Sequence, residues 1–288
     1  MKMIAASALP ESGRGTFYAS PYSAAAARLP VAAATSAPAS GAAGRLEAQG
    51  FLLVPDVLQP AECSALAIDV QAGLHPAGGS KACTPSASGG QRNLLEQRWC
   101  QDLARRLQQL PALTGLIPAS LVAVQCTYFE KTPARNWLVP LHQDLSIPVA
   151  ERVGARVLQG WSEKDGALFV QPPASVLQEL LAVRLHLDPC HADDGPLRVV
   201  PASHHQGVLA PATARAVRAS AGELACHADA GTVLLMRPLL LHASSKATGG
   251  SRRRVLHFVF GPRQLPCGLR WSVGAAAGTA GLTQPLDH

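Results

Sequence analysis

The stretch that decides the fold is "GTVLLMRPLLLHASSKATGGSRRRVLHFVF", Gly231 to Phe260. It contains two apolar runs, Gly231 to Met236 and Arg253 to Phe260, on either side of the turn-forming pair Gly249-Gly250. Runs this short, rich in Val, Leu and Phe and bounded by glycine, are typical of strands. Both faces of each run are apolar enough to be buried, so the stretch predicts two strands of a β-rich core.

More elements of both kinds lie upstream of this stretch. Strands are expected at Leu121 to Phe129, Leu138 to Ile147, Leu181 to Leu187 and Leu197 to Val200, with turn signals such as Asp194-Gly195-Pro196 between them. Before them, apolar residues at helical spacing predict helices at Gln59 to Leu74 and Leu94 to Leu110, and Arg45 to Val57 holds a short strand. Helices followed by many strands predict a mainly β fold, a sandwich or barrel with helices packed outside it.

The N-terminal segment differs from the rest. Residues 1–44 are mostly Ala, Ser and Pro with no hydrophobic period, so we expect a low-complexity, disordered leader followed by a single domain over residues 45–288. A transit peptide to an organelle is the alternative, although such peptides are rich in arginine and only Arg14 and Arg28 occur here. His75 to Gly90, rich in Gly, Ser and Ala, predicts a mobile loop that can act as a lid.

Composition excludes several classes of protein. Apolar residues make up 48% of the chain, which suits a substantial core, but no run reaches the roughly 18 apolar residues of a membrane helix. The net charge is +6, yet the basic residues are scattered apart from Arg252 to Arg254, which argues against nucleic acid and suits a small anionic substrate. Seven cysteines without a CxxC pair indicate a reducing compartment, and we expect the cytoplasm.

The segment "NWLVPLHQDLSIPV", Asn136 to Val149, carries a candidate metal site. On a strand, side chains alternate between faces, so His142 and Asp144 are expected to point the same way and Gln143 the opposite way. An imidazole and a carboxylate joined by a remote histidine form the facial triad of iron(II) oxygenases, which leaves coordination positions open. A histidine and an aspartate two apart also occur by chance, so the motif needs its second half.

That second half lies a hundred residues further on. His242 ends an apolar run, where a buried imidazole without a partner such as a metal would be costly. Ser244 follows on the same face, and Arg253 opens the next strand with a planar fork suited to a carboxylate. Alternation puts Arg253 on one face of its strand and Arg252 and Arg254 on the other, but periodicity alone does not say which face lines the interior.

Three features together resemble the phytanoyl-CoA dioxygenase family of iron(II) and 2-oxoglutarate-dependent oxygenases. They are the HxD segment, the segment "DDGPLRVVPASHHQG" from Asp193 to Gly207, and the spacing of His242 and Arg253. Asp194 and Ala202 depart from the Asn and Gly usual in that family. The resemblance, from about Gly50 to Trp271, implies a double-stranded β-helix, a cupin-like jelly-roll barrel with flanking N-terminal α-helices. It also implies that His142, Asp144 and His242 are catalytic iron ligands, and that Arg253, helped by Ser244, binds the distal carboxylate of 2-oxoglutarate.

The resemblance further implies the chemistry. The cofactors would be Fe(II), 2-oxoglutarate as co-substrate and O2, and the reaction would oxidise an unactivated C–H bond of a small-molecule substrate and release succinate and CO2. Related halogenases replace the carboxylate ligand with a small residue, so Asp144 favours hydroxylation, or another oxidation such as desaturation, over halogenation. One alternative is a non-catalytic jelly-roll binding protein that retains the metal motif. Another is a zinc or manganese cupin-like enzyme, which Arg253 disfavours because that chemistry needs no anchor for a dicarboxylate. The sequence indicates neither the substrate nor the oligomeric state.

Overall fold

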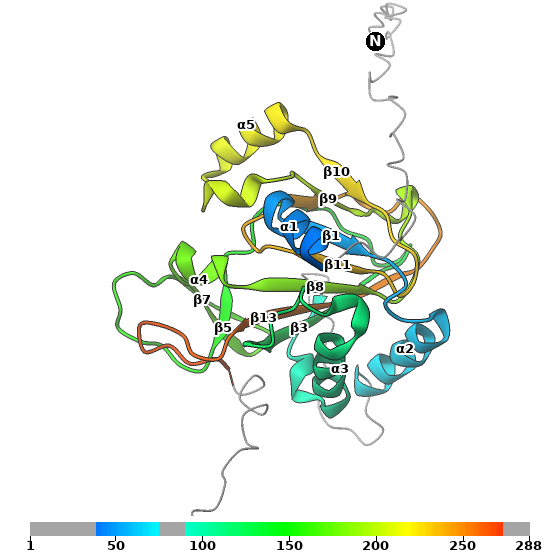
Figure 1. Ribbon diagram of the computed structural model, residues 1–288, viewed down its shortest axis with the longest axis horizontal. Coiled ribbons are helices and arrows are strands. Elements are labelled where there is room, and N and C mark those ends of the chain that lie inside the picture. Colours follow the sequence, from blue (N-terminus) through cyan, green and yellow to red (C-terminus); the bar gives the residue numbers. More distant parts are fainter. Residues whose placement is uncertain (1–38, 75–89, 273–288) are drawn as a thin grey trace, which may run out of the picture. The chain divides into compact units, whose positions relative to one another are not determined.

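The computed structural model describes residues 39–74 and 90–272 (Figure 1). The helices are α1 (Ala39–Gln49), α2 (Pro60–Leu74), α3 (Arg98–Gln109), α4 (Ala174–Gln178) and α5 (Pro211–Ala221). The strands are β1 (Phe51–Val54), β2 (Gly90–Gln91), β3 (Leu121–Lys131), β4 (Val139–His142), β5 (Ile147–Val149), β6 (Gln159–Lys164), β7 (Ala167–Gln171), β8 (Leu181–His186), β9 (Leu197–Val199), β10 (Leu224–Cys226), β11 (Val233–Met236), β12 (His242–Ser244) and β13 (Arg253–Pro262).

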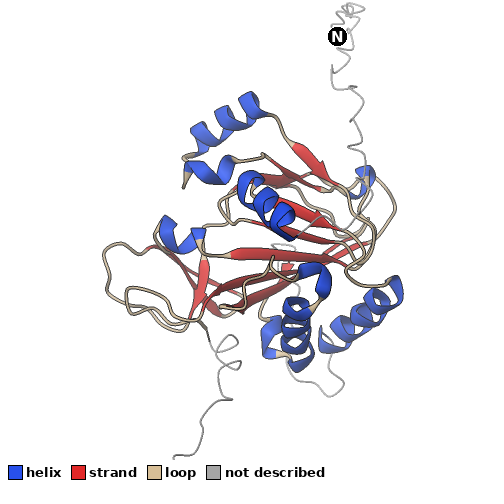
Figure 2. Ribbon diagram, in the orientation of Figure 1, coloured by secondary structure: helices blue, strands red, loops and turns tan. Residues whose placement is uncertain are grey.

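The strands form two facing antiparallel sheets and a small third one. The larger sheet has the order β1-β11-β8-β13-β3-β2, and the smaller has the order β10-β9-β12-β4. Inward-facing residues of both sheets form one apolar cluster, among them Ala182, Leu234 and Met236 from the larger sheet and Leu197 and Val199 from the smaller. Figure 2 shows the two strand layers with helices outside them. This arrangement confirms the expected mainly β, jelly-roll fold.

Helices α2 and α3 cover the outer face of the six-stranded sheet, as Figure 1 shows. In α3 the buried residues Cys100, Leu103, Ala104 and Leu107 follow the spacing of one helix face. They belong to the same apolar cluster as Leu256 and Phe258 of β13. Alternate residues of β13, starting from Arg253, therefore point away from the helices and into the barrel.

The N-terminal elements differ in their bounds from the expectation. Helix α1 begins at Ala39, before the expected domain boundary at residue 45, and only Phe51–Val54 of the expected strand region is extended. The alanine-rich sequence favours a helix, and Leu46 is buried in the cluster under α2 and α3. Residues 1–38 of the expected leader and residues 75–89 of the expected loop lie outside the described residues.

The expected single strand from Leu138 to Ile147 is two strands that belong to different sheets. Strand β4 ends at His142, and β5 pairs with β7 in the three-stranded sheet β5-β7-β6. Pro140 lies within β4 and Pro148 within β5, so the break falls between them, at residues 143–146. The backbone N–H of Asp144 instead donates to the carbonyl of Pro238 at 2.9 Å. Asp144 therefore lies beyond the end of the strand on which we expected it.

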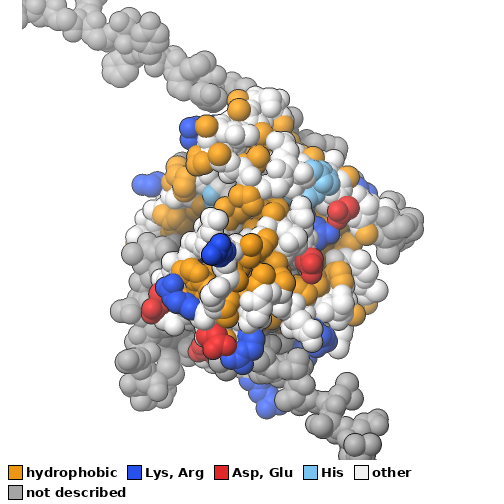
Figure 3. Space-filling view, turned by 90° about the vertical axis from the view of Figure 1, so that its left-hand side faces the viewer, with side chains coloured by type: hydrophobic (Ala, Val, Ile, Leu, Met, Phe, Trp, Pro, Cys, Tyr) orange, Lys and Arg blue, Asp and Glu red, His pale blue; other side chains and the backbone are white. Residues whose placement is uncertain are grey.

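The hairpin of β6 and β7 was not predicted, although its turn has a clear signal. Asp165 and Gly166 have φ values of 51° and 77°, as a two-residue hairpin turn of the Asp-Gly kind requires. Figure 3 shows the side of the molecule on which α4, β5 and β7 lie. Apolar side chains gather on it, and the Lys and Arg side chains are scattered over it rather than aligned in a stripe. None of the described helices is long and apolar enough to cross a membrane.

Candidate metal centre

Strands β4 and β12 bring two histidines into direct contact. His142 and His242 are register partners in the four-stranded sheet, and their ring centroids lie 4.1 Å apart. Nδ1 of His142 lies 2.9 Å from the carbonyl of Pro140, and Nδ1 of His242 lies 2.8 Å from the carbonyl of Leu240. A ring that donates its Nδ1–H to a carbonyl keeps the lone pair on Nε2. Both Nε2 atoms are therefore suited to bind a metal.

Asp144 completes the group. Its two carboxylate oxygens lie 3.6 Å from Nε2 of His142 and 3.8 Å from Nε2 of His242. The candidate ligand atoms of all three residues lie within 4.8 Å of one another, which fits a single ion. Among residues 39–74 and 90–272, no other group of three His, Cys, Asp or Glu side chains meets this condition.

The charge states of the group also suit a metal. Burial lowers the pKa of His242 to about 4, so its ring is neutral at neutral pH. Burial alone would raise the pKa of Asp144, but the neighbouring rings of His242 and His142 outweigh it and leave this pKa well below its usual range. A neutral imidazole and an ionised carboxylate are the forms that bind a metal.

Gln143 holds the irregular segment between the two ligands His142 and Asp144. Its side chain points away from the group, as expected, and is buried. Its amide nitrogen donates to the carbonyls of Gly207 (2.8 Å) and Leu239 (2.6 Å), and its amide oxygen accepts from the N–H of Leu209 (2.8 Å). These bonds tie the HxD segment to the chain that leads into β12.

The segment from Asp193 to Gly207 positions the strands on which His242 and Arg253 lie. The hydroxyl of Ser203 accepts from the N–H of Leu241 at 2.8 Å, next to His242. At the other end of the segment, the carbonyl of Gly195 accepts a hydrogen bond from Arg253 Nη1. The motif is thus a structural support for the site rather than a set of ligands.

Three polar side chains meet inside the barrel near the start of β13. Arg253 is 4% exposed, and its Nε has no hydrogen-bond partner among the described residues. Lys131, its register partner on β3, is 1% exposed and donates to the hydroxyl of Ser244 at 3.1 Å and to the carbonyl of Ser245. Burial and Arg253 lower the pKa of Lys131 to about 7. Among the described residues, no carboxylate lies within 4 Å of either cationic group, so the pair is suited to an anion.

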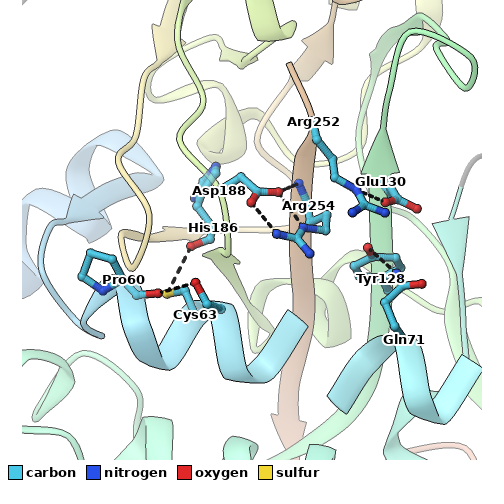
Figure 4. Close-up of polar contacts among 10 residues, drawn as sticks. Pro60, Cys63, Gln71, Tyr128, Glu130, His186, Asp188, Arg252 and Arg254 are labelled. Carbon is cyan, nitrogen blue, oxygen red and sulfur yellow. Dashed lines mark hydrogen bonds and ion pairs between the residues drawn. The ribbon is translucent and has the colours of Figure 1, made fainter. Parts of the chain in front are cut away.

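The neighbours of Arg253 face outward, as alternation predicts. Arg254 forms two side-chain bonds to the carboxylate of Asp188, at 2.8 and 2.7 Å, and Arg252 bonds Glu130 at 2.6 Å (Figure 4). The structure therefore brings together His142, Asp144 and His242, and separately Arg253 and Ser244. Lys131 was not predicted as a site residue, because its contacts depend on how β3 and β13 pair.

A jelly-roll barrel that carries two histidines and one carboxylate around a shared point has the donor set of the non-haem iron(II) oxygenases. The model of the phytanoyl-CoA dioxygenase (PhyH) family matches residues 46–255, well over half of the chain. The chain therefore belongs to the phytanoyl-CoA dioxygenase family. Its cofactors are iron and 2-oxoglutarate, with O2 as oxidant. No curated protein shows a significant sequence match.

Several solved structures share the fold. SnoK, a non-haem alpha-ketoglutarate-dependent carbocyclase from nogalamycin biosynthesis, has a TM-score of 0.57 and 16% identity, over 83% of this chain and 88% of its own. HygX from Streptomyces hygroscopicus, with nickel and 2-oxoglutarate bound, has a TM-score of 0.53 and 18% identity, over 78% and 88%. EctD from S. alaskensis, with 2-oxoglutarate and 5-hydroxyectoine, has a TM-score of 0.58 and 16% identity, over 76% and 74%.

We predict that Gln143→Leu destabilises the protein although Gln143 touches no candidate ligand atom. The change leaves two carbonyls and one N–H without their partner, and each unpaired buried group costs about 1–3 kcal/mol. Urea unfolding followed by circular dichroism should show a loss of stability of several kcal/mol. Gln206→Leu, on an exposed side chain nearby, is the control and should unfold like the parent. Equal midpoints for both variants would contradict the anchoring role of Gln143.

Proposed function

We propose that this protein hydroxylates an unactivated C–H bond of a small molecule, with Fe(II) held by His142, Asp144 and His242. The convergence of these three side chains on one point carries the proposal. We further propose that Arg253, with Lys131 and Ser244, binds the distal carboxylate of 2-oxoglutarate. When bound, the iron and 2-oxoglutarate supply the activation of O2 that oxidises the C–H bond and yields succinate and CO2.

The residues of the chain fit these two groups. Two imidazoles and a carboxylate suit Fe(II), and three ligands leave positions for the co-substrate and O2. The guanidinium of Arg253 can grip a carboxylate through two parallel bonds, which would also give its buried Nε a partner. The barrel interior around Arg253 and Lys131 excludes water, which strengthens these charge-assisted bonds.

Asp144 favours hydroxylation, or another oxidation such as desaturation, over halogenation. It supplies a third ligand, so the centre has no position vacated for a halide. EctD is described with 5-hydroxyectoine, whereas SnoK is described as a carbocyclase. The fold therefore suits several oxidations, and the complete triad argues against halogenation alone.

The test is spectroscopic and chemical. Under argon, the protein with Fe(II) and 2-oxoglutarate should show the weak visible charge-transfer band of chelated 2-oxoglutarate. In air, it should release succinate from 2-oxoglutarate. A protein that binds no Fe(II) and shows no band would be a non-catalytic barrel instead.

We predict that His142→Ala and His242→Ala each abolish the band and the release of succinate, because each removes one of three metal bonds. Iron content after gel filtration, measured by atomic absorption, should fall in parallel. His227→Ala, on an exposed histidine outside the site, is the matched control and should keep both signals. Near-native succinate release by either of the first two variants would disprove the ligand assignment.

The three adjacent arginines make a second prediction. Arg253→Ala should raise the Kd of 2-oxoglutarate by roughly thirty-fold or more, since a bidentate charge-assisted contact contributes on the order of 2–4 kcal/mol. Arg252→Ala, which removes only the outward pair with Glu130, should change it no more than a few-fold. Titration of the charge-transfer band under argon gives both constants. A large effect of Arg252→Ala with none of Arg253→Ala would reverse the assignment.

Lys131 makes the affinity for 2-oxoglutarate depend on pH. Its pKa of about 7 in the free protein should rise when a carboxylate binds beside it. Above pH 7 the free protein loses this proton while the complex keeps it, so the Kd should increase as the pH rises from 7 to 9. In Lys131→Met the Kd should be higher than that of the parent at pH 7 and nearly constant from pH 7 to 9. A variant whose Kd still climbs like that of the parent would exclude Lys131 as the titrating group.

A further inference from the structure

A second buried arginine lies inside the barrel and has no role in the function proposed above. Arg184 on β8 is 8% exposed, and its register partner on β13 is His257. Its Nη1 lies 3.1 Å from Nδ1 of His257, and its guanidinium lies 5.6 Å from the centre of the Phe129 ring. Its Nε is buried without a hydrogen-bond partner among the described residues.

Arg184 also lacks a partner of opposite charge. The half-buried arginines Arg198, Arg237 and Arg254 each pair with a carboxylate, from Glu223, Glu47 and Asp188 respectively. In the described part of the chain, no carboxylate lies within 4 Å of the Arg184 guanidinium. Burial and Arg184 itself lower the pKa of His257 to about 3, so this neighbour is neutral. A buried cation left in this state is costly unless something else pairs with it.

Arg184 and Arg253 lie on neighbouring strands, at different positions along them. His257, which lies beside Arg184, is four residues beyond Arg253 on β13, a separation of about 13 Å along a strand. Burial and the charge of Arg253 lower the pKa of Arg184 to about 10, and the charge of Asp144 opposes them, so Arg184 is within electrostatic reach of both Arg253 and the triad. One molecule of 2-oxoglutarate whose distal carboxylate paired with Arg253 would leave Arg184 without a carboxylate.

Lys164 is a second cation whose pKa the charge of Asp144 affects. Lys164 at the end of β6 lies over the ring of Phe169, with Nζ 4.7 Å from its centre. Burial and Arg92 lower the pKa of Lys164, while the charge of Asp144 opposes them.

We propose that the substrate oxidised at this site is a carboxylic acid and that its carboxylate pairs with Arg184. This inference rests on the proposed function, because it names the substrate of that same site. The carboxylate would accept hydrogen bonds from the guanidinium, whose Nε is unsatisfied, and the ring of Phe129 would adjoin the carbon skeleton. Arg184 thus binds and orients the substrate, and Arg253 binds the co-substrate.

The test compares acids with their own primary amides, which match in shape but lack the charge. The probes are benzoate and benzamide, hexanoate and hexanamide, and N-acetyl-leucine and its amide. Each is titrated by calorimetry into the protein with Fe(II) and 2-oxoglutarate under argon. At least one acid should bind the parent protein ten-fold or more tightly than its amide, and Arg184→Met should lose this preference.

Three controls make the result specific. Arg184→Lys keeps the charge and should restore part of the preference for the acid over its amide. If Arg184 had only a structural role, its variants would change the melting temperature and leave the acid-to-amide ratio unchanged. Arg198→Met, on an arginine that has its own carboxylate, should keep the ratio of the parent. The Kd of 2-oxoglutarate should stay within two-fold in all these variants.

The inference is overturned if no acid is preferred over its amide, or if Arg184→Met keeps the preference. It is also overturned if Arg184→Met weakens 2-oxoglutarate ten-fold, since Arg184 would then belong to the co-substrate. The charge-transfer band of the parent protein is read in the same samples. Its absence would disprove the proposed function, while the calorimetric ratio still decides the role of Arg184.

Discussion

Both imidazoles of the candidate metal centre are oriented by the same contact, a bond from Nδ1 to the carbonyl two residues earlier in the chain. This contact selects the tautomer and turns each Nε2 toward the other strand. Since His142 and His242 are register partners, the pairing of β4 with β12 brings the two nitrogens to one point. Asp144, two residues after His142, lies beside the same two nitrogens, and the hydrogen bonds of Gln143 fix the segment between His142 and Asp144.

The two faces of the six-stranded sheet divide stability and function between them. Leu256 and Phe258 of β13 pack against α2 and α3 on the outer face, in the largest apolar cluster of the described residues. The inner face of the same strand carries Arg253 and His257, beside Lys131 and Arg184. Apolar burial on one face therefore offsets the cost of polar groups that are incompletely paired on the other. Alternation along a strand makes this division possible within single elements.

The parts of the site that strand alternation controls were predictable from the sequence. Alternation placed His242 and Ser244 on one face of a short strand, and both are buried. It also put Arg253 on the face opposite Arg252 and Arg254, but the choice of Arg253 as the inward residue came from the spacing of the family. Asp144 reached the same place by a different route, because the ladder ends at His142 and the chain then passes to another sheet. The reason given for its direction was therefore wrong, although its proximity to His142 is confirmed.

Lys131 could not be assigned a role from the sequence, because its contact with Ser244 joins residues 113 positions apart. Arg184 is similar: alternation places it on one face of β8, but only the pairing of β8 with β13 sets it beside His257. Helix α1 was missed for another reason. Its alanines resemble those of the low-complexity segment before it, and only tertiary burial of Leu46 distinguishes them.

The unpaired cations of the interior link the stability of this fold to its ligands. Arg253 and Arg184 each have a buried Nε without a hydrogen-bond partner among the described residues. The charge of Arg253 also lowers the pKa of Lys131 and of Arg184. An anion that pairs with either one relieves that cost only in the folded state, so it stabilises the fold by mass action. Replacing such an arginine with an apolar residue would remove the cost of the buried charge, but the protein would then no longer bind the anion. Two anionic ligands, one for each guanidinium as we propose above, would offset this cost.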